Sequence, residues 1–261
     1  MIFINHDDLR SKVCFEECIS HGLFVSDRIE DMKYADIIYL GKSGLDRKNF
    51  LFTGCESEYV DEIKLSQLKK DSIVFTLVYN EYLNELSKKY HFDYIALMND
   101  KMFKEENAIL TAEGLIAYLL THRLNPLYKT RVLVLGYGDC GKNIIKRLEG
   151  FECVLSIYSR NLDNYMENNC TFTSQMDELD FSQFDIIINT IPEVIIYKDA
   201  IDQMKKSVMI VDIASYPYGI DHHYALNQGF NSIILPSIPN KYAYHYAGIM
   251  IYRHLREKSE C

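Results

Sequence analysis

The stretch VLVLGYGDCGKNIIKRL, residues 132–148, decides the fold of the second half of the chain. It passes from an apolar strand pattern through a G-x-G-x-x-G turn into a helical pattern. In such a turn the first glycine permits a tight bend, the second lets the backbone approach a diphosphate, and the third lets helix and strand pack closely. The start of the helix attracts anions. The stretch therefore predicts a dinucleotide site whose phosphate-binding turn comprises Gly136, Tyr137, Gly138, Asp139, Cys140 and Gly141. The alternative is a turn that has lost its ligand.

Two side chains of this turn leave alternatives open. A carboxylate at Asp139 that pointed inward would repel phosphate oxygens, so we expect it to face solvent. Cys140 could be a reactive thiol, because a helix N-terminus stabilises a thiolate. Its small size suits a crowded turn equally well, and we favour the packing role.

Short apolar runs around the turn predict an α/β fold with a doubly wound parallel sheet. Strands are predicted at residues 131–136, 153–160, 184–192, 208–215 and 231–236, with helical periodicity between them. The first half shows the same alternation more weakly. There we predict strands at residues 1–5, 37–40, 72–77 and 94–97, and helices at residues 7–21 and 79–90.

Two longer helices divide the chain. AILTAEGLIAYLLTHR, residues 108–123, has a helical pattern that Asn125 and Pro126 end, because proline disfavours helical geometry in the residue before it. Apolar residues at helical spacing predict a closing helix over residues 242–257. We therefore expect a substrate-side α/β domain at residues 1–107 and a dinucleotide-binding domain at residues 108–261, with a cleft between them.

The ends of the predicted strands indicate which dinucleotide binds. NAD-binding folds place an acidic residue about 20 residues after the glycine turn to bind the ribose 2′-hydroxyl. Here that position carries Ser159, Arg160 and Asn161, which favours NADP and leaves NAD possible, although Arg160 could be a plain surface residue. Other residues after buried strands are expected to border the cofactor, with simple strand termination as the alternative: Thr190, Ile191, Pro192, Ala214, Ser215 and Pro236.

Composition excludes several classes of function. The chain has 261 residues with 28 basic and 37 acidic side chains, and the net charge of −9 opposes binding to nucleic acid or anionic lipid. No apolar run approaches the length of a membrane span, and an acidic pair at Asp7 and Asp8 stands where a secretory signal would be basic, so we expect a cytoplasmic protein. Seven cysteines without zinc-ligand spacing predict reduced thiols and no metal, and we assign the adjacent His222 and His223 to the surface.

Several motifs together resemble the A-subunit family of dipicolinate synthase, within the wider formate- and hydroxyacid-dehydrogenase superfamily. They are TAEG (111–114), VLVLGYGDCGK (132–142), YSRN (158–161), INTIP (188–192), VDIASYPYGID (211–221) and ILPSIPNKYAYHYAG (234–248). The resemblance implies a flavodoxin-like N-terminal domain and an NADP-linked oxidoreductase of sporulation. Such an enzyme converts a tetrahydrodipicolinate-type precursor to dipicolinate with the flavoprotein-like B-subunit of dipicolinate synthase. The chain departs from the family at Asn5–Asp8, where a glycine-bearing turn is usual, and at Ser237, where the family has glycine.

Four residues are candidates for the chemistry. Lys241 and His245 are suited to bind a small dicarboxylate substrate, unless they are a solvated lysine and a packed histidine. The TAEG motif supplies Glu113, for proton handling or nicotinamide orientation, and Thr111; both could instead serve only as residues of a helix start.

Two other functions compete with this hypothesis. One is a D-2-hydroxyacid dehydrogenase, although the arginine expected after residues 208–215 is replaced by Tyr216 and Pro217. The other is a nucleotide-binding interaction subunit without catalysis. We also expect a homo-oligomer.

Overall fold

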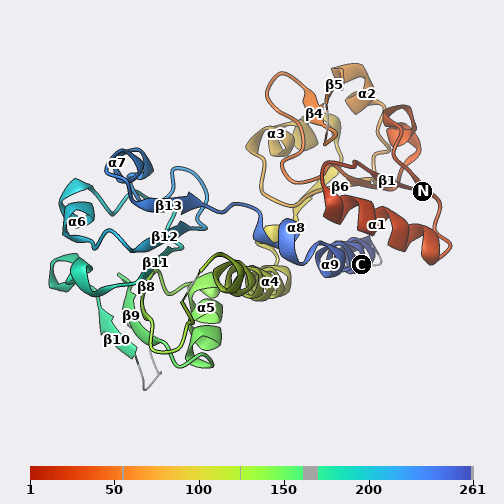
Figure 1. The fold of residues 1–261 in the computed structure, drawn as a ribbon. Coiled ribbons are helices and arrows are strands. Elements are labelled where there is room, and N and C mark those ends of the chain that lie inside the picture. Colours follow the sequence, from red (N-terminus) through yellow and green to blue (C-terminus); the bar gives the residue numbers. More distant parts are fainter. Residues whose placement is uncertain (55, 124, 161–169, 260–261) are drawn as a thin grey trace. The chain divides into compact units, whose positions relative to one another are not determined.

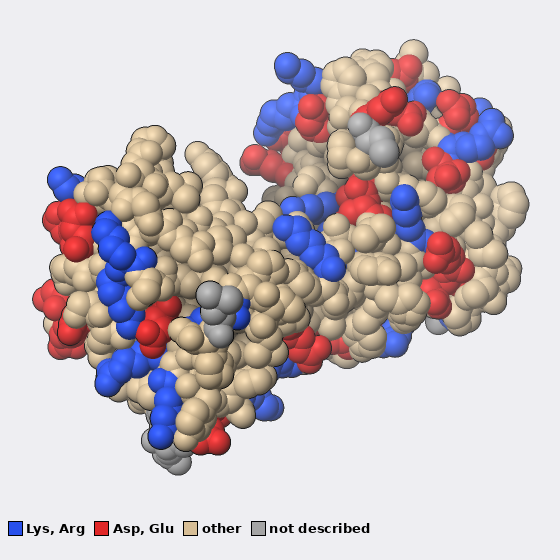
Figure 2. Space-filling model, viewed as in Figure 1, with Lys and Arg blue, Asp and Glu red and all other residues tan. Residues whose placement is uncertain are grey.

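The computed structural model describes residues 1–54, 56–123, 125–160 and 170–259 (Figure 1). The chain forms two compact units: unit 1 contains Met1–Asn107 and Ala243–Cys261, and unit 2 contains Ala108–Tyr242. Among the described helices, none has both the length and the apolar character that crossing a bilayer requires. On the face shown in Figure 2, acidic and basic side chains are interspersed over both units.

Unit 2 contains a parallel sheet in the order β10-β9-β8-β11-β12-β13. The strands are β8 (Arg131–Leu135), β9 (Val154–Tyr158), β10 (Cys170–Thr173), β11 (Ile186–Asn189), β12 (Met209–Asp212) and β13 (Asn231–Ile234). Numbered along the chain this is the order 3-2-1-4-5-6 of the Rossmann fold. The predicted doubly wound domain is confirmed, and β10 is a strand that the sequence patterns did not indicate.

Helices cover both faces of this sheet (Figure 1). On one face α4 (Lys101–His122) and α5 (Asp139–Glu149) pack on Val132 and Val134 of β8. On the other face α6 (Lys198–Gln203), α7 (His222–Asn227) and the short helices η3 (Met176–Glu178) and η4 (Phe181–Gln183) pack around Leu133 and Leu135. Successive side chains of a strand point to opposite faces, so a strand covered on both faces is apolar throughout. The helix α8 (Ile238–Tyr242) ends the unit.

Unit 1 contains a second parallel sheet, in the order β2-β1-β3-β6-β7. Its strands are β1 (Ile2–Ile4), β2 (Val25–Ser26), β3 (Ile37–Tyr39), β6 (Ile73–Thr76) and β7 (Asp93–Ala96). This is the flavodoxin-like order 2-1-3-4-5, as the family resemblance implied. An antiparallel hairpin and shorter helices complete the unit: β4 (Phe50–Phe52), β5 (Ser57–Tyr59), α2 (Glu62–Ser66), α3 (Glu81–Tyr90), η1 (Ile29–Tyr34) and η2 (Leu97–Asn99).

The C-terminal helix α9 (Tyr244–Ser259) belongs to unit 1, whereas the sequence-based division placed it with residues 108–261. It packs along α1 (Leu9–Ser20), and Gly248 allows the two helices to approach closely. A Cβ on Gly248 would lie 2.5 Å from the Cβ of Val13 and 2.6 Å from the carbonyl oxygen of Arg10. The apolar pattern of α9 shows that one face is buried, but a pattern does not identify the surface that buries it.

Candidate dinucleotide-binding site

Two glycines of the turn after β8 are required by the packing of the protein itself. Gly136 has a φ of +103°, and its N–H donates to the carbonyl of Tyr158 at 2.8 Å. A Cβ on Gly136 would collide with the hydroxyl of Thr190. A Cβ on Gly141 would collide with the carbonyl of Gly136. The first and third glycines therefore hold the strand, the turn and α5 together.

Gly138 is different. It is the N-cap of α5, its φ of −81° is open to any residue, and no side chain caps the helix there. Apart from its two chain neighbours, no atom of the described residues would lie within 4 Å of a Cβ on Gly138, and the residue is exposed. Packing does not require glycine at this position, but the absence of a side chain leaves open space against a helix N-terminus. That is the environment that a diphosphate needs.

The other residues of the turn are partly buried. Tyr137 meets Phe172 edge-on at 5.9 Å between ring centroids, and Nζ of Lys142 lies 5.3 Å from the Tyr137 ring. The carbonyl of Asp139 accepts a hydrogen bond from the Asn143 amide at 2.9 Å. Cys140 is not part of a disulfide, and it packs against the core between the sheet and α4 and α5. This position agrees with the packing role expected for Cys140.

The segment after β11 is tied to β8. The backbone N–H and the hydroxyl of Thr190 both donate to the carbonyl of Leu135, each at 2.9 Å. The N–H of Ile191 donates to the side-chain oxygen of Asn189 at 3.1 Å, and Pro192 is exposed. The Thr190 hydroxyl, proposed from sequence to border the nicotinamide, therefore has a structural partner within the protein.

The structure contains a buried polar network at the carboxyl end of β12 that the sequence analysis did not predict. Asp212, at the end of β12, is fully buried and accepts four hydrogen bonds. The donors are the amide of Asn189 at 2.9 Å, the N–H of Ala214 at 3.0 Å, the N–H of Gly219 at 2.8 Å and Nε2 of His222 at 3.1 Å. Asp212 thus anchors both ends of the loop after β12, which carries the candidate site residues Ala214 and Ser215.

The interpretation of His222 as a surface residue is wrong. Its ring is buried between Asp212 and Ser232, with Nδ1 2.8 Å from the Ser232 hydroxyl, whereas His223 is exposed. Adjacent residues at the start of a helix point in different directions, so a pair of histidines can divide between core and solvent. The sequence signal that could have located His222 is the Asp212 carboxylate at the end of a buried strand, since a buried carboxylate requires donors.

The predicted ribose-binding position lies at the carboxyl end of β9. The N–H of Ser159 donates to the carbonyl of Thr173 at 3.1 Å. Arg160 is exposed and forms an ion pair with Glu193, with 2.8 Å between Nη2 and Oε2. Asn161, the third residue predicted there, lies outside the described residues. Of the remaining cofactor candidates, Ala214 is buried and Ser215 and Pro236 are exposed.

The sequence analysis placed Thr111 and Glu113 at the start of a helix. In the structure both residues lie in the middle of α4. The helix begins at Lys101, where the carboxylate of Asp100 accepts from the N–H of Phe103 at 3.1 Å. Residues 101–107 read KMFKEEN, and this mixture of charged and apolar side chains concealed the start of the helix. Thr111 is buried, while Glu113 is 58% exposed and pairs with Arg147 of α5 at 2.9 Å. A cap role for either residue is therefore excluded.

Lys241 and His245 lie on different helices. Lys241 is an exposed residue of α8 in unit 2, and His245 is an exposed residue of α9 in unit 1. The two residues are four positions apart in the sequence, but because they belong to different helices this spacing does not place them on one helix face. Among the described residues, no group of three or more His, Cys, Asp or Glu side chains could hold a metal ion.

Asp7, at the carboxyl ends of β1 and β3 in unit 1, is an ionisable group in an unusual environment. Asp7 accepts a hydrogen bond from the N–H of Lys42 through Oδ2, and its buried Oδ1 has no hydrogen-bond partner among the described residues. Burial, reinforced by the carboxylate of Asp8, raises the pKa of Asp7 from 3.8 to about 6. Asp7 was not a candidate in the sequence analysis.

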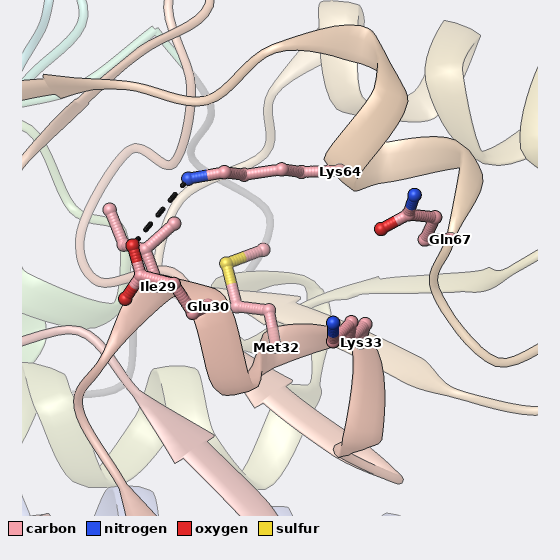
Figure 3. Close-up of a pocket in the computed structure, with 6 residues that line it drawn as sticks. All are labelled: Ile29, Glu30, Met32, Lys33, Lys64 and Gln67. Atoms are coloured by element: carbon pink, nitrogen blue, oxygen red, sulfur yellow. Dashed lines mark ion pairs between the residues drawn. The ribbon is translucent and has the colours of Figure 1, made fainter.

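A cavity of about 100 Å³ lies between η1 and α2 in unit 1 (Figure 3). Lys64 and Glu30 face each other across it, 3.8 Å apart. The cavity is smaller than the roughly 300–1,000 Å³ typical of sites for small ligands. We assign no ligand to it.

Comparison with known proteins places these features in context. Residues 100–215 match the family described as D-isomer specific 2-hydroxyacid dehydrogenase, NAD binding domain. The A-subunit of dipicolinate synthase from Bacillus subtilis is 27% identical over 181 residues, which cover 67% of this chain and 61% of that protein. The aligned stretch is thus less than two thirds of the relative.

Solved structures share the fold. The A-subunit of dipicolinate synthase from Bacillus halodurans superposes with a TM-score of 0.86 at 23% identity, over 99% of this chain and 97% of that one. D-lactate dehydrogenase from Escherichia coli gives a TM-score of 0.66 at 15% identity, over 99% and 96%. The chain therefore contains a nicotinamide-dinucleotide-binding domain of the 2-hydroxyacid dehydrogenase type, and its resemblance to the A-subunit of dipicolinate synthase, predicted from its motifs, is confirmed.

Proposed function

We propose that the chain is an NADP-linked oxidoreductase that acts on a tetrahydrodipicolinate-type precursor and works with a flavoprotein-like partner subunit in the cytoplasm. The observation that carries the dinucleotide part is Gly138, a glycine that the protein's own packing does not need, at the N-terminus of a helix. The substrate and the partner are supported by the similarity to the A-subunit of dipicolinate synthase.

The residues present fit a dinucleotide. Backbone at Gly138 and the first turn of α5 would hold the diphosphate, and Ser159 and Arg160 would contact the ribose of the adenosine. When bound, the nicotinamide supplies or accepts a hydride. Thr190 and Ala214, held by Leu135 and Asp212, border the carboxyl edge of the sheet where the nicotinamide end would lie.

The chain's own side chains must bind and orient the substrate and move a proton. Lys241 and His245 can supply cationic and hydrogen-bonding groups to a dicarboxylate, and both are exposed. Glu113 remains the candidate for proton transfer, and its exposed carboxylate is held by Arg147. These assignments are proposals drawn from residue type and exposure.

NADP is proposed over NAD because of Arg160. The guanidinium follows β9 at the position where a carboxylate would select NAD, and a guanidinium binds a phosphate through two parallel hydrogen bonds. It is 62% exposed and so accessible to a ligand.

The proposal is tested in two steps. Calorimetric titration of the purified chain with NADP, NADPH, NAD and NADH should show binding, and failure to bind any of them at millimolar concentration would end the oxidoreductase proposal. NADPH formation from a freshly generated tetrahydrodipicolinate pool, with and without the flavoprotein-like partner, then tests the substrate. Binding without turnover under both conditions would favour the second candidate, a non-catalytic nucleotide-binding interaction subunit. The ion pair that engages Glu113 is the observation in favour of that candidate.

A further inference from the structure

The ion pair between Arg160 and Glu193 joins the two sides of the proposed cofactor site. Arg160 comes shortly after β9, and Glu193 comes shortly after β11. These two strands flank β8 in the sheet, one on each side, and β8 leads into the glycine turn. The contact of 2.8 Å therefore spans the carboxyl end of β8.

The strand ends that lead to the two residues are held by hydrogen bonds. The end of β9 is held by the hydrogen bond from the N–H of Gly136 to the carbonyl of Tyr158, at 2.8 Å. The segment leading to Glu193 is held by Thr190, which donates twice to the carbonyl of Leu135. The strand ends therefore fix where these two opposite charges can meet, although the side chains themselves are exposed.

The exposure of the pair makes it easy to open. Arg160 is 62% exposed and Glu193 is 58% exposed. Exposed ion pairs contribute little to stability, because water and salt screen the charges and two long side chains must be ordered. A phosphate dianion, which binds a guanidinium through two charge-assisted hydrogen bonds, can thus take the place of the Glu193 carboxylate on Arg160.

We propose that Glu193 sets the choice between NADP and NAD in this chain, by competing with the 2′-phosphate of NADP for Arg160. The carboxylate also repels that phosphate, and it can accept a hydrogen bond from the 2′-hydroxyl of NAD. Arg160 and Glu193 thus favour opposite cofactors. The inference rests on the proposed dinucleotide function. It adds a residue that follows β11, whereas the choice of cofactor is usually decided by the residues that follow the strand corresponding to β9.

The test compares the affinities of NADPH and NADH for the full chain and its variants by calorimetry. Glu193→Gln should tighten NADPH binding by about fivefold, the order expected for loss of an exposed charge contact, and leave NADH binding unchanged or weaker. Arg160→Gln should weaken NADPH binding by a similar factor. In the double variant, the gain from Glu193→Gln should shrink, because the guanidinium for which Glu193 competes is gone.

Glu152→Gln is the matched control. Glu152 is exposed and precedes β9, at the opposite edge of the sheet, so the same change of charge there should leave the NADPH to NADH ratio as in the wild type. Thermal unfolding checks that each variant is folded. If the wild type binds dinucleotide and Glu193→Gln leaves the ratio at the control value, the role of Glu193 is overturned while the proposed function stands. If the wild type binds neither dinucleotide, both are overturned.

Discussion

The hydroxyl of Thr190 lies where a side chain on Gly136 would begin, and it donates at 2.9 Å to the carbonyl of Leu135, the residue just before that glycine. The end of β11 is thus packed directly on the turn that follows β8. This contact separates the glycines of the turn into those that the fold needs and one that it does not.

The glycines should therefore respond differently to alanine. Gly136→Ala introduces both a collision and a strained φ, and we expect a loss of unfolding free energy of about 2–4 kcal/mol. Gly138→Ala should change stability by no more than about 1 kcal/mol, since its Cβ meets no side chain of the described residues, but should weaken dinucleotide binding. Urea unfolding and calorimetry on both variants measure the two effects. Equal affinity in wild type and Gly138→Ala would contradict the placement of the diphosphate.

The buried carboxylate of Asp212 should be important for stability. Asp212→Ala leaves donors from Asn189, Ala214, Gly219 and His222 without their acceptor, and we expect a cost of about 3 kcal/mol or more. Ser232→Ala removes only one partner of His222 and should cost about 1 kcal/mol. Exposed His223→Gln is the control, with no expected change in the unfolding midpoint.

A catalytic Glu113 can be distinguished from one that only pairs with Arg147. If its carboxylate transfers a proton, Glu113→Gln should lower turnover by about 100-fold or more, with little change in dinucleotide affinity. Arg147→Gln breaks the same ion pair but keeps the carboxylate, so its turnover should stay close to that of the wild type. Both variants should unfold within about 1 kcal/mol of the wild type. Equal turnover in the two variants would remove Glu113 from the mechanism.

The raised pKa of Asp7 predicts that the stability of the protein depends on pH. Its folded pKa of about 6 lies above the ordinary value of 3.8, so protonation of Asp7 favours the folded state, and this contribution is lost as pH rises through 6. Asp7→Asn cannot ionise and should avoid the loss. The unfolding free energy of the variant minus that of the wild type should then be larger at pH 7 than at pH 4.5, by about 2 kcal/mol. Urea titrations at the two pH values measure this difference, and a constant difference would show that Asp7 titrates normally.

The contact of α9 with α1 is also testable. Gly248→Val places a branched side chain where a single Cβ would already crowd Val13, so we expect a loss of about 2–3 kcal/mol. The exposed neighbour Tyr246→Ala should cost less than about 1 kcal/mol. Circular dichroism during thermal unfolding compares the two.

Strands that contain several consecutive apolar residues could be predicted from the sequence, because such a run indicates a buried strand. Residues 184–192 contain three consecutive isoleucines, residues 186–188, and these form most of β11. In contrast, β10 reads CTFT, in which polar and apolar residues mix, as at many sheet edges. The glycine turn was predictable because its three positions follow one another in the chain.

The parts of the candidate site that depend on distant residues were not predictable. The ring of His222 links Ser232 to Asp212; the carboxylate of Asp212 after a buried strand signals that it needs donors, but no local pattern identifies His222 and Ser232 as its partners. Glu193 likewise reaches Arg160 from another strand end, so the absence of a carboxylate after β9 did not exclude one beside Arg160. The start of α4 was misplaced because the turn after its capping residue, Asp100, mixes charged and apolar side chains.

The assignment of α9 to unit 1 has a consequence for the order in which the protein acquires its structure. Unit 2 is one uninterrupted piece of chain, whereas unit 1 is made of two pieces that flank it. During synthesis the Rossmann sheet can form once residue 242 has left the ribosome, whereas α1 can pack on α9 only after α9 has also been translated. We therefore expect native structure to be completed first in the dinucleotide-binding unit and last in the unit that contains the N-terminus.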